Sequence, residues 1–217
     1  MHAIHLKSVS HYFQSSTERI VLFRNLSLDI QAGRSYSIEG PSGAGKSSLL
    51  TLIAGLETPK EGQVDFTLDN RTVTQIALRK HSGFIFQQFH LLPELDALSN
   101  LALPLRLKGD REACDKAHVW LKKIGMENRA AHKPTQLSGG EQQRIAIARA
   151  FISDPVFIFA DEPTGNLDEK TSASIAELMF NFGRMDKKAL VLVTHSRALA
   201  AKADYRFRMA AGGLEQL

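Results

Sequence analysis

The feature that most constrains this chain is a glycine-rich stretch, GPSGAGKS, at residues 40–47. It matches the pattern G-x-x-x-x-G-K-[ST], whose glycines let backbone N–H groups turn inward around phosphate oxygens. A strand is expected before it at 35–39, and a helix after it from about 46 to 54. The positive end of that helix adds to the attraction for an anion. The stretch therefore predicts an α/β fold with a site for a nucleotide phosphate.

Each position of this loop has an expected task. Lys46 supplies a point charge to the β- and γ-phosphates, and the hydroxyl of Ser47 ligates Mg²⁺. Such a pattern arises by chance in roughly one chain of this size in a hundred, so a mere glycine-rich turn is the weaker interpretation. The residues expected to contact the nucleotide are Gly40, Pro41, Ser42, Gly43, Ala44, Gly45, Lys46, Ser47 and Ser48.

An acidic pair, Asp161 and Glu162, follows the apolar run at 156–160. A carboxylate at the carboxyl end of a parallel strand lies where α/β sheets bind their ligands. Asp161 is expected to hold Mg²⁺, and Glu162 to act as the general base that polarises the attacking water. Alone, an acidic pair at a strand end is usually solvated; beside a phosphate loop, the catalytic interpretation is favoured.

The hexapeptide LSGGEQ at 137–142 stands at the start of a helix expected to run to about residue 152. Two glycines after a serine expose backbone N–H groups at a helix N-terminus, which makes a second anion site. Lys46 already serves the chain's own γ-phosphate, so this second site is expected to serve a nucleotide on a partner subunit. Its residues are Ser138, Gly139, Gly140 and Glu141. Capping of the helix by Ser138 is compatible with that role.

The remaining pattern predicts the architecture. A second buried-type strand at 189–193 follows a helix near 171–182, and strand–helix–strand order with apolar strands favours a parallel sheet covered on both faces. Early segments at 4–6 and 26–30 alternate as half-buried strands do. Residues 91–151 contain helical pattern only, including a helix at 111–124, and are expected to form an insertion.

Composition excludes several classes of protein. The net charge of the 217 residues is only +4 and the basic residues are spread out, so charge does not suggest a nucleic-acid partner. A single cysteine, Cys114, excludes an internal disulfide framework. No segment approaches the roughly 18 apolar residues of a membrane span, so work at a membrane would require another chain.

With these three motifs the chain resembles the ABC transporter ATPases over nearly its whole length. The resemblance implies a P-loop NTPase (RecA-like) parallel-sheet core with an N-terminal antiparallel β subdomain and an inserted α-helical subdomain. Residues 1–217 are then one domain, with the core at 1–87 and 155–217 and the helical subdomain at 88–154. It also implies ATP and Mg²⁺ as cofactors, an ATP-sandwich homodimer, and a separate integral membrane permease. The implied location is the cytoplasmic face of the bacterial inner membrane.

The resemblance also assigns single residues. Gln87 is implied to contact Mg²⁺ and water, although neighbouring Gln88 leaves the register open. Asp168 is implied to belong to a loop that crosses the dimer interface, and His195 is implied to contact the γ-phosphate. Phe13 is implied to stack on adenine, with Tyr12 as its rival.

Within the family, residues 83–104 and 161–168 resemble the group that serves lipoprotein release, macrolide export and cell division. Segment 88–101 is expected to contact the permease, whose identity decides the substrate. The alternative is a soluble ABC ATPase acting on DNA or ribosomes. It is disfavoured because the chain has one phosphate loop, one cysteine and only a short segment between Gln87 and Ser138.

Overall fold

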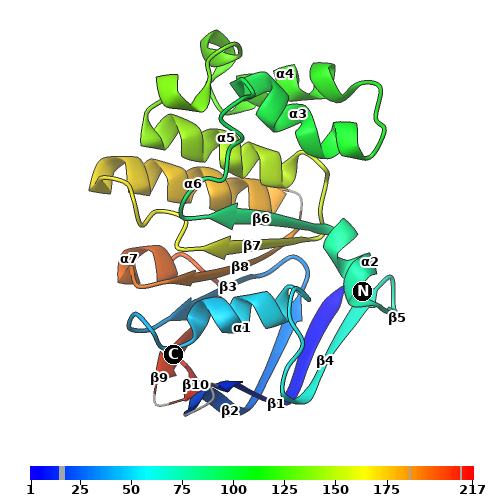
Figure 1. The fold of residues 1–217 in the computed structure, drawn as a ribbon, viewed down its shortest axis with the longest axis vertical. Helices are drawn as coiled ribbons and strands as arrows, with labels where there is room; N and C mark the ends of the chain where they lie inside the picture. Colours follow the sequence, from blue (N-terminus) through cyan, green and yellow to red (C-terminus); the bar gives the residue numbers. More distant parts are fainter. Residues whose placement is uncertain (15–17, 186, 211) are drawn as a thin grey trace.

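Two β-sheets with one helix between them organise the fold (Figure 1). The computed structural model describes residues 1–14, 18–185, 187–210 and 212–217. The smaller sheet is antiparallel, and its strands lie in the order β2 (Arg19–Gln31), β1 (Ala3–Gln14), β4 (Glu61–Leu68) and β5 (Arg71–Val73).

The larger sheet has six strands and is parallel except at one edge, where β10 runs antiparallel to β9. Its order is β10 (Gly213–Gln216), β9 (Tyr205–Ala210), β3 (Ser35–Glu39), β8 (Ala189–Thr194), β7 (Phe157–Asp161) and β6 (Ser82–Phe86). The predicted fold class, a parallel core with an antiparallel β subdomain, is confirmed.

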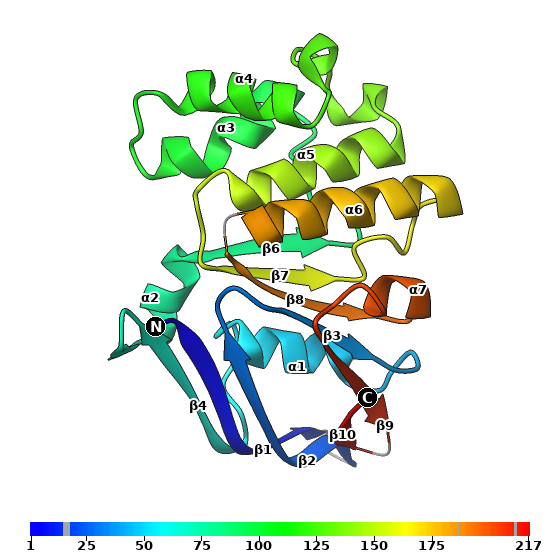
Figure 2. The ribbon, with the colours of Figure 1, turned by 180° about the vertical axis from the view of Figure 1, so that it is seen from behind.

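Both faces of the parallel sheet are covered, as its continuously apolar strands predict. Phe157 and Phe159 of β7 face one core, which contains α1 (Lys46–Ile53) and the antiparallel sheet. Ile158 and Ala160 face the other core. There, α5 (Gly139–Phe151), α6 (Glu169–Met185) and the short α7 (Arg197–Ala200) pack, and Figure 2 shows α1 and α6 on opposite sides of the strands.

The helical insertion has a core of its own. It contains α3 (Ala97–Leu107), α4 (Ala113–Lys123) and one side of α5, which bury Leu101, Leu121 and Ile145. The helix predicted at 111–124 corresponds to α4, which buries its apolar residues in this core, and Gly125 ends it with a left-handed φ of 69°. None of the described helices is long and apolar enough to cross a membrane.

The sequence pattern missed several elements. Strand β1 is longer than predicted because bulges between Leu6 and Tyr12 interrupt its alternation. Strand β6 contains Gly83, at which a Cβ would collide with the carbonyl oxygen of Ala150, so glycine lets α5 approach closely. The sequence pattern also failed to predict β4, β5, β9, β10, α7 and α2 (Gln75–Lys80).

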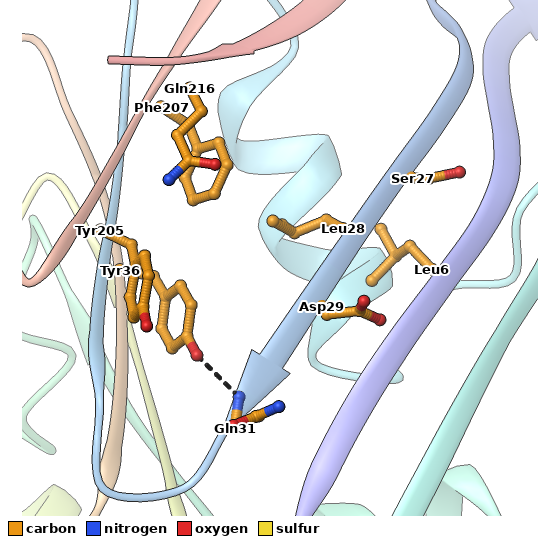
Figure 3. A pocket seen from close by; sticks show the side chains of 9 residues that line it. All are labelled: Leu6, Ser27, Leu28, Asp29, Gln31, Tyr36, Tyr205, Phe207 and Gln216. Atoms are coloured by element: carbon orange, nitrogen blue, oxygen red, sulfur yellow. Dashed lines mark hydrogen bonds between the residues drawn. The ribbon is translucent and has the colours of Figure 1, made fainter.

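An open hollow of about 390 Å³ lies between the two sheets where β2 faces β3 and β9 (Figure 3). The rings of Tyr36 and Tyr205 stack in it with centroids 5.1 Å apart. The hydroxyl oxygen of Tyr36 accepts a hydrogen bond from the backbone N–H of Gln31 at 2.9 Å, and burial raises the Tyr36 pKa. This contact fixes the turn between β2 and β3, and therefore the strand that leads into the phosphate loop.

The fold depends on one buried amide in the insertion. Asn100 is fully buried, and its side chain bonds both the N–H and the C=O of Leu92 as well as the carbonyls of Leu95 and Asp96. We expect Asn100→Ala to lower the free energy of unfolding by about 3 kcal/mol, because buried backbone groups lose their partners. Ser99→Ala on the same helix should cost less than about 0.5 kcal/mol. Urea unfolding compares them, and equal losses would contradict the assignment.

Candidate active site

The phosphate loop is bonded along its backbone by its own lysine. Lys46 is buried, and its ammonium donates to the carbonyl oxygens of Gly40 and Pro41, both at 2.9 Å. Gly45 has a left-handed φ of 91°, and a Cβ there would press within 3.2 Å of the Leu22 side chain. The loop therefore places a positive charge at the N-terminus of α1 with little freedom to move.

Ser47 and Asp161 meet at the carboxyl edge of the parallel sheet. The Ser47 hydroxyl donates to Oδ1 of Asp161 at 3.0 Å. Burial raises the pKa of the Asp161 carboxyl and the charge of Glu162 adds to the rise, while Ser47 and Lys46 oppose it. Two adjacent hard oxygen ligands beside a phosphate loop form a donor set that Mg²⁺ accepts, since this ion binds through one or two carboxylates plus phosphates.

Glu162 lies directly after β7 and is fixed by the end of β8. Its Oε2 accepts hydrogen bonds from the Thr194 hydroxyl at 3.1 Å and the His195 N–H at 3.2 Å, and lies 3.0 Å from His195 Nδ1. Its Oε1 is 3.9 Å from the ammonium of Lys46. Glu162 has a left-handed φ of 44°, a conformation that non-glycine residues adopt only rarely. The structure thus brings together Lys46, Glu162 and His195.

Gln87 follows β6 and meets the loop that contains Asp168. The register pairs Phe86 with Asp161, so Gln87 emerges at the same sheet edge. Its Nε2 donates to Oδ1 of Asn166 at 3.0 Å, and Asn166 Nδ2 donates to the Gln87 carbonyl at 3.1 Å. These contacts belong to Gln87 rather than to Gln88, while its predicted metal role stays a prediction.

Ser138, in the hexapeptide at 137–142 that we call the signature, caps its helix. Ser138 Oγ accepts from the Glu141 N–H at 3.3 Å, and Oε2 of Glu141 accepts from the Ser138 N–H at 2.8 Å, which lowers the Glu141 pKa. Arg129 donates to the other oxygen of Glu141 at 3.0 Å. Helices α5 and α1 begin on the same side of the molecule but on opposite faces of the sheet (Figures 1 and 2). Ser138 is exposed, available to another chain.

Asp168 stands at the start of α6, where its Oδ1 accepts from the Thr171 N–H at 3.0 Å. Hydrogen bonds to Thr171 lower its pKa. The loop of Asp168 therefore caps a helix, and its predicted place at a dimer interface stays a prediction.

The two aromatic candidates point to different faces of β1. Phe13 is about half exposed and touches the buried ring of His11 edge-on at 5.8 Å. His11 stacks in turn on Phe23, which adjoins Gly45 of the phosphate loop. The guanidinium carbon of Arg19 lies 3.5 Å from the centroid of the Tyr12 ring. These contacts favour Phe13 as the adenine-stacking residue, because its side of the strand faces the loop.

Two residues of the site escaped the sequence analysis. Thr194 orients Glu162, and buried Glu39 stands immediately before the loop, where Arg208 lies 3.2 Å away and Arg206 3.8 Å away. Both are polar residues at the last position of a strand that ends at the ligand-binding edge. That position could have identified them as site residues from the sequence.

Several known proteins have sequences similar to that of this chain. A family profile described as "ABC transporter" matches residues 23–165. The lipoprotein-releasing system ATP-binding protein LolD of Acinetobacter baylyi is 41% identical over 214 residues, covering 95% of this chain and 94% of that protein. LolD of Oleidesulfovibrio alaskensis is 42% identical over 218 residues, which cover 96% of this chain and 94% of that protein.

Solved structures share the fold. A dimeric structure of the ATP-binding cassette MJ0796, in a post-hydrolysis state bound to ADP and Pi, matches with a TM-score of 0.85 and 38% identity. The match covers 99% of this chain and 98% of that one. A second dimeric structure, of MJ0796 as a bacterial ABC transporter cassette, has the same TM-score and 39% identity. The resemblance inferred from the motifs is confirmed.

The phosphate loop predicts a lysine-dependent nucleotide site. We expect Lys46→Ala to weaken ATP binding and to lower kcat by about two to three orders of magnitude, because the fixed charge at the β- and γ-phosphates is lost. Lys60→Ala removes an exposed ammonium outside the loop and should leave both unchanged. Calorimetric titration and a phosphate-release assay measure the effects, and wild-type turnover in Lys46→Ala would refute the assignment.

Proposed function

The chain belongs to the ABC transporter family, and on that premise we propose that it hydrolyses Mg-ATP as half of a homodimer that drives a separate permease. The type of transport proposed is lipoprotein release, at the cytoplasmic face of a bacterial inner membrane. One observation carries the proposal: Glu162 is clamped between Lys46 at 3.9 Å and His195 at 3.0 Å, beside the Ser47–Asp161 pair.

The two oxygens of Glu162 have different tasks in this proposal. Oε2 is occupied by Thr194 and His195, which hold the carboxylate in place. Oε1 faces Lys46 and remains available to accept a proton from water. His195, whose side chain is about 60% exposed, stands at the rim where a γ-phosphate would lie. Glu162 is therefore the general base, and His195 and Thr194 orient it.

The proposed Mg²⁺ site lies at the same carboxyl edge of the parallel sheet. Ser47 and Asp161 would hold Mg²⁺, and Gln87 would complete the set from the end of β6. Mg²⁺ held there would supply positive charge against the negative charge that develops in phosphoryl transfer. The adenine end of the nucleotide is assigned to Phe13.

Two copies are needed for a complete site. The N-terminus of α5, with Ser138, Gly139 and Gly140, lies across the sheet from the chain's own phosphate loop (Figure 1). We assign it to the γ-phosphate bound by the other copy, with Asp168 at the interface. We also assign residues 1–87 and 155–217 to the nucleotide-binding core, and 88–154 to the helical subdomain.

The permease contact is assigned to an apolar groove of about 310 Å³, which we call the β6 groove. Segment 88–101 was predicted to form this contact, and this stays a prediction, although Asn100 and Leu101 at its end are buried. The groove lies beside that segment, and its main lining residues are Phe84, Phe86, Leu103, Pro104, Leu107 and Arg149. A soluble ABC ATPase acting on DNA or ribosomes is not favoured, since the relatives above carry names from lipoprotein release.

The general-base assignment predicts a trapped dimer. Glu162→Gln should retain ATP binding but lose hydrolysis, because the amide keeps an acceptor for Thr194 and His195 yet cannot take a proton from water. With Mg-ATP this variant should elute from size exclusion as a dimer, and without nucleotide as a monomer. Glu177→Gln, an exposed position on α6, should hydrolyse normally. Full turnover in Glu162→Gln would exclude Glu162 as the base.

The dimer assignment predicts that the signature acts in trans. Ser138→Arg should leave ATP binding nearly intact and abolish hydrolysis, because the added bulk blocks the other copy's phosphate site. Loss of the cap costs only about 1 kcal/mol. Mixing Ser138→Arg with Lys46→Ala chains should restore activity, since each mixed dimer contains one intact site. Equal loss of binding and turnover in Ser138→Arg would place the signature in cis.

A further inference from the structure

Three aromatic rings lie in sequence beneath the position assigned to adenine, and we call them the ring column. Phe13 lies edge-on against His11, with ring centroids 5.8 Å apart and an angle of 81° between the planes. His11 in turn stacks on Phe23 at 6.0 Å and 24°. The ring of Phe23 lies 3.5 Å from the position that a Cβ would take at Gly45. The ring column therefore extends from the phosphate loop to Phe13.

The pairing of β1 with β2 places these rings together. His11 lies directly opposite Phe23, and the register of β1 shifts on both sides of His11. Such bulges turn side chains away from the regular alternation of a strand. His11 and Phe23 are fully buried, whereas about half of the Phe13 surface is exposed. The exposed part of the Phe13 ring is available to a base, and His11 supports the ring from within.

Histidine is an unfavourable residue for such a buried position unless a polar group faces it. Neither ring nitrogen of His11 makes a hydrogen bond within the described residues. Burying polar atoms without partners costs free energy, and a phenylalanine would fill the same space without that cost. Oε1 of Glu57 lies 3.2 Å from Nε2 of His11, close enough for attraction but not aligned as a hydrogen bond. The contact with Glu57 gives a reason for histidine that packing alone does not.

Glu57 connects the ring column to the helix that follows the phosphate loop. Its Oε2 accepts a hydrogen bond from the Thr51 hydroxyl at 3.4 Å, and its N–H donates to the Thr51 carbonyl at 3.3 Å. Thr51 lies on α1, the helix that begins at Lys46. His11 is thus held on one side by Phe23 and on another by Glu57. The residues assigned to the base and to the phosphates are therefore tied to the same short helix.

We propose that His11 is a positioning residue, which holds the Phe13 ring in the orientation that stacks on the adenine of ATP. This inference rests on the proposed function, in which Phe13 receives the base, and adds the residue that fixes that ring. A ring that is already immobilised loses less conformational freedom when the base binds, so the affinity for ATP rises. Stacking is the same before and during phosphoryl transfer, so His11 should affect KM and leave kcat unchanged.

The test compares a ligand that has a base with one that has none. His11→Leu fills the core without a planar ring, and should weaken ATP binding by about fivefold or more, the range of base–aromatic stacking. Binding of inorganic triphosphate and kcat at saturating ATP should not change. His11→Phe restores a ring and should recover most of the affinity for ATP. His5→Ala, on the same strand but outside the ring column, is the control and should bind ATP normally. Calorimetric titration measures both ligands.

A double substitution tests the contact between His11 and Glu57. Glu57→Ala should weaken ATP binding about threefold in the wild-type chain, because His11 loses the group that faces it. The same change should have no effect in a chain that carries His11→Phe, which has no ring nitrogen. Equal losses in the two chains would show that Glu57 does not act through His11.

The remaining outcomes separate this inference from the proposed function. If Phe13→Ala binds ATP as tightly as the wild type, the assignment of Phe13 to adenine is wrong. If Phe13→Ala weakens ATP binding and His11→Leu does not, the positioning role of His11 is refuted while the proposed function stands. If His11→Leu weakens triphosphate binding as much as ATP binding, His11 supports the whole site and the inference is also wrong. Circular dichroism confirms that each variant is folded.

Discussion

The ammonium of Lys46 is the charge around which the rest of the site is arranged. A buried ammonium is costly unless its three donors find acceptors, and here two carbonyls of the phosphate loop supply them at 2.9 Å. The third direction is met by Oε1 of Glu162 at 3.9 Å. These contacts fix the shape of the loop, and the carboxylate of Glu162, the proposed general base, lies toward the same point.

Parallel strands deliver the other groups to that point. Ile38 of β3 pairs with Val193 of β8, and Val193 pairs with Asp161 of β7. Asp161 pairs with Phe86 of β6, so four neighbouring strands end at one level. The residues just beyond those ends are Gly40, Glu162, His195 and Gln87. Strand register thus determines the site more than the conformation of any single loop does.

This arrangement explains what the sequence could predict. Strand β3 and helix α1 flank a glycine-rich motif, and β7 and β8 are continuously apolar, so their pattern was unambiguous. Bulges hid the length of β1, and β9, with sequence YRFRMA, alternates as a strand does but is only six residues long and was missed. The contact of Gln87 with Asn166 joins segments 79 residues apart, which spacing alone cannot reveal. Motifs in the sequence pointed to Asp161 and Glu162, whereas the contact by which Thr194 orients Glu162 could be recognised only in the tertiary structure.

The chain between β6 and α3 links the surfaces on which the protein acts. Phe86 lines the β6 groove, Gln87 bonds the loop that leads to Asp168, and Arg149 fixes the carbonyls of Phe89 and His90. These contacts lie within five consecutive residues, so a shift at one is passed to the others over a short, constrained path. Coupling between binding sites is reciprocal. A partner in the groove that prefers one position of Gln87 must therefore bind more tightly when nucleotide favours that same position.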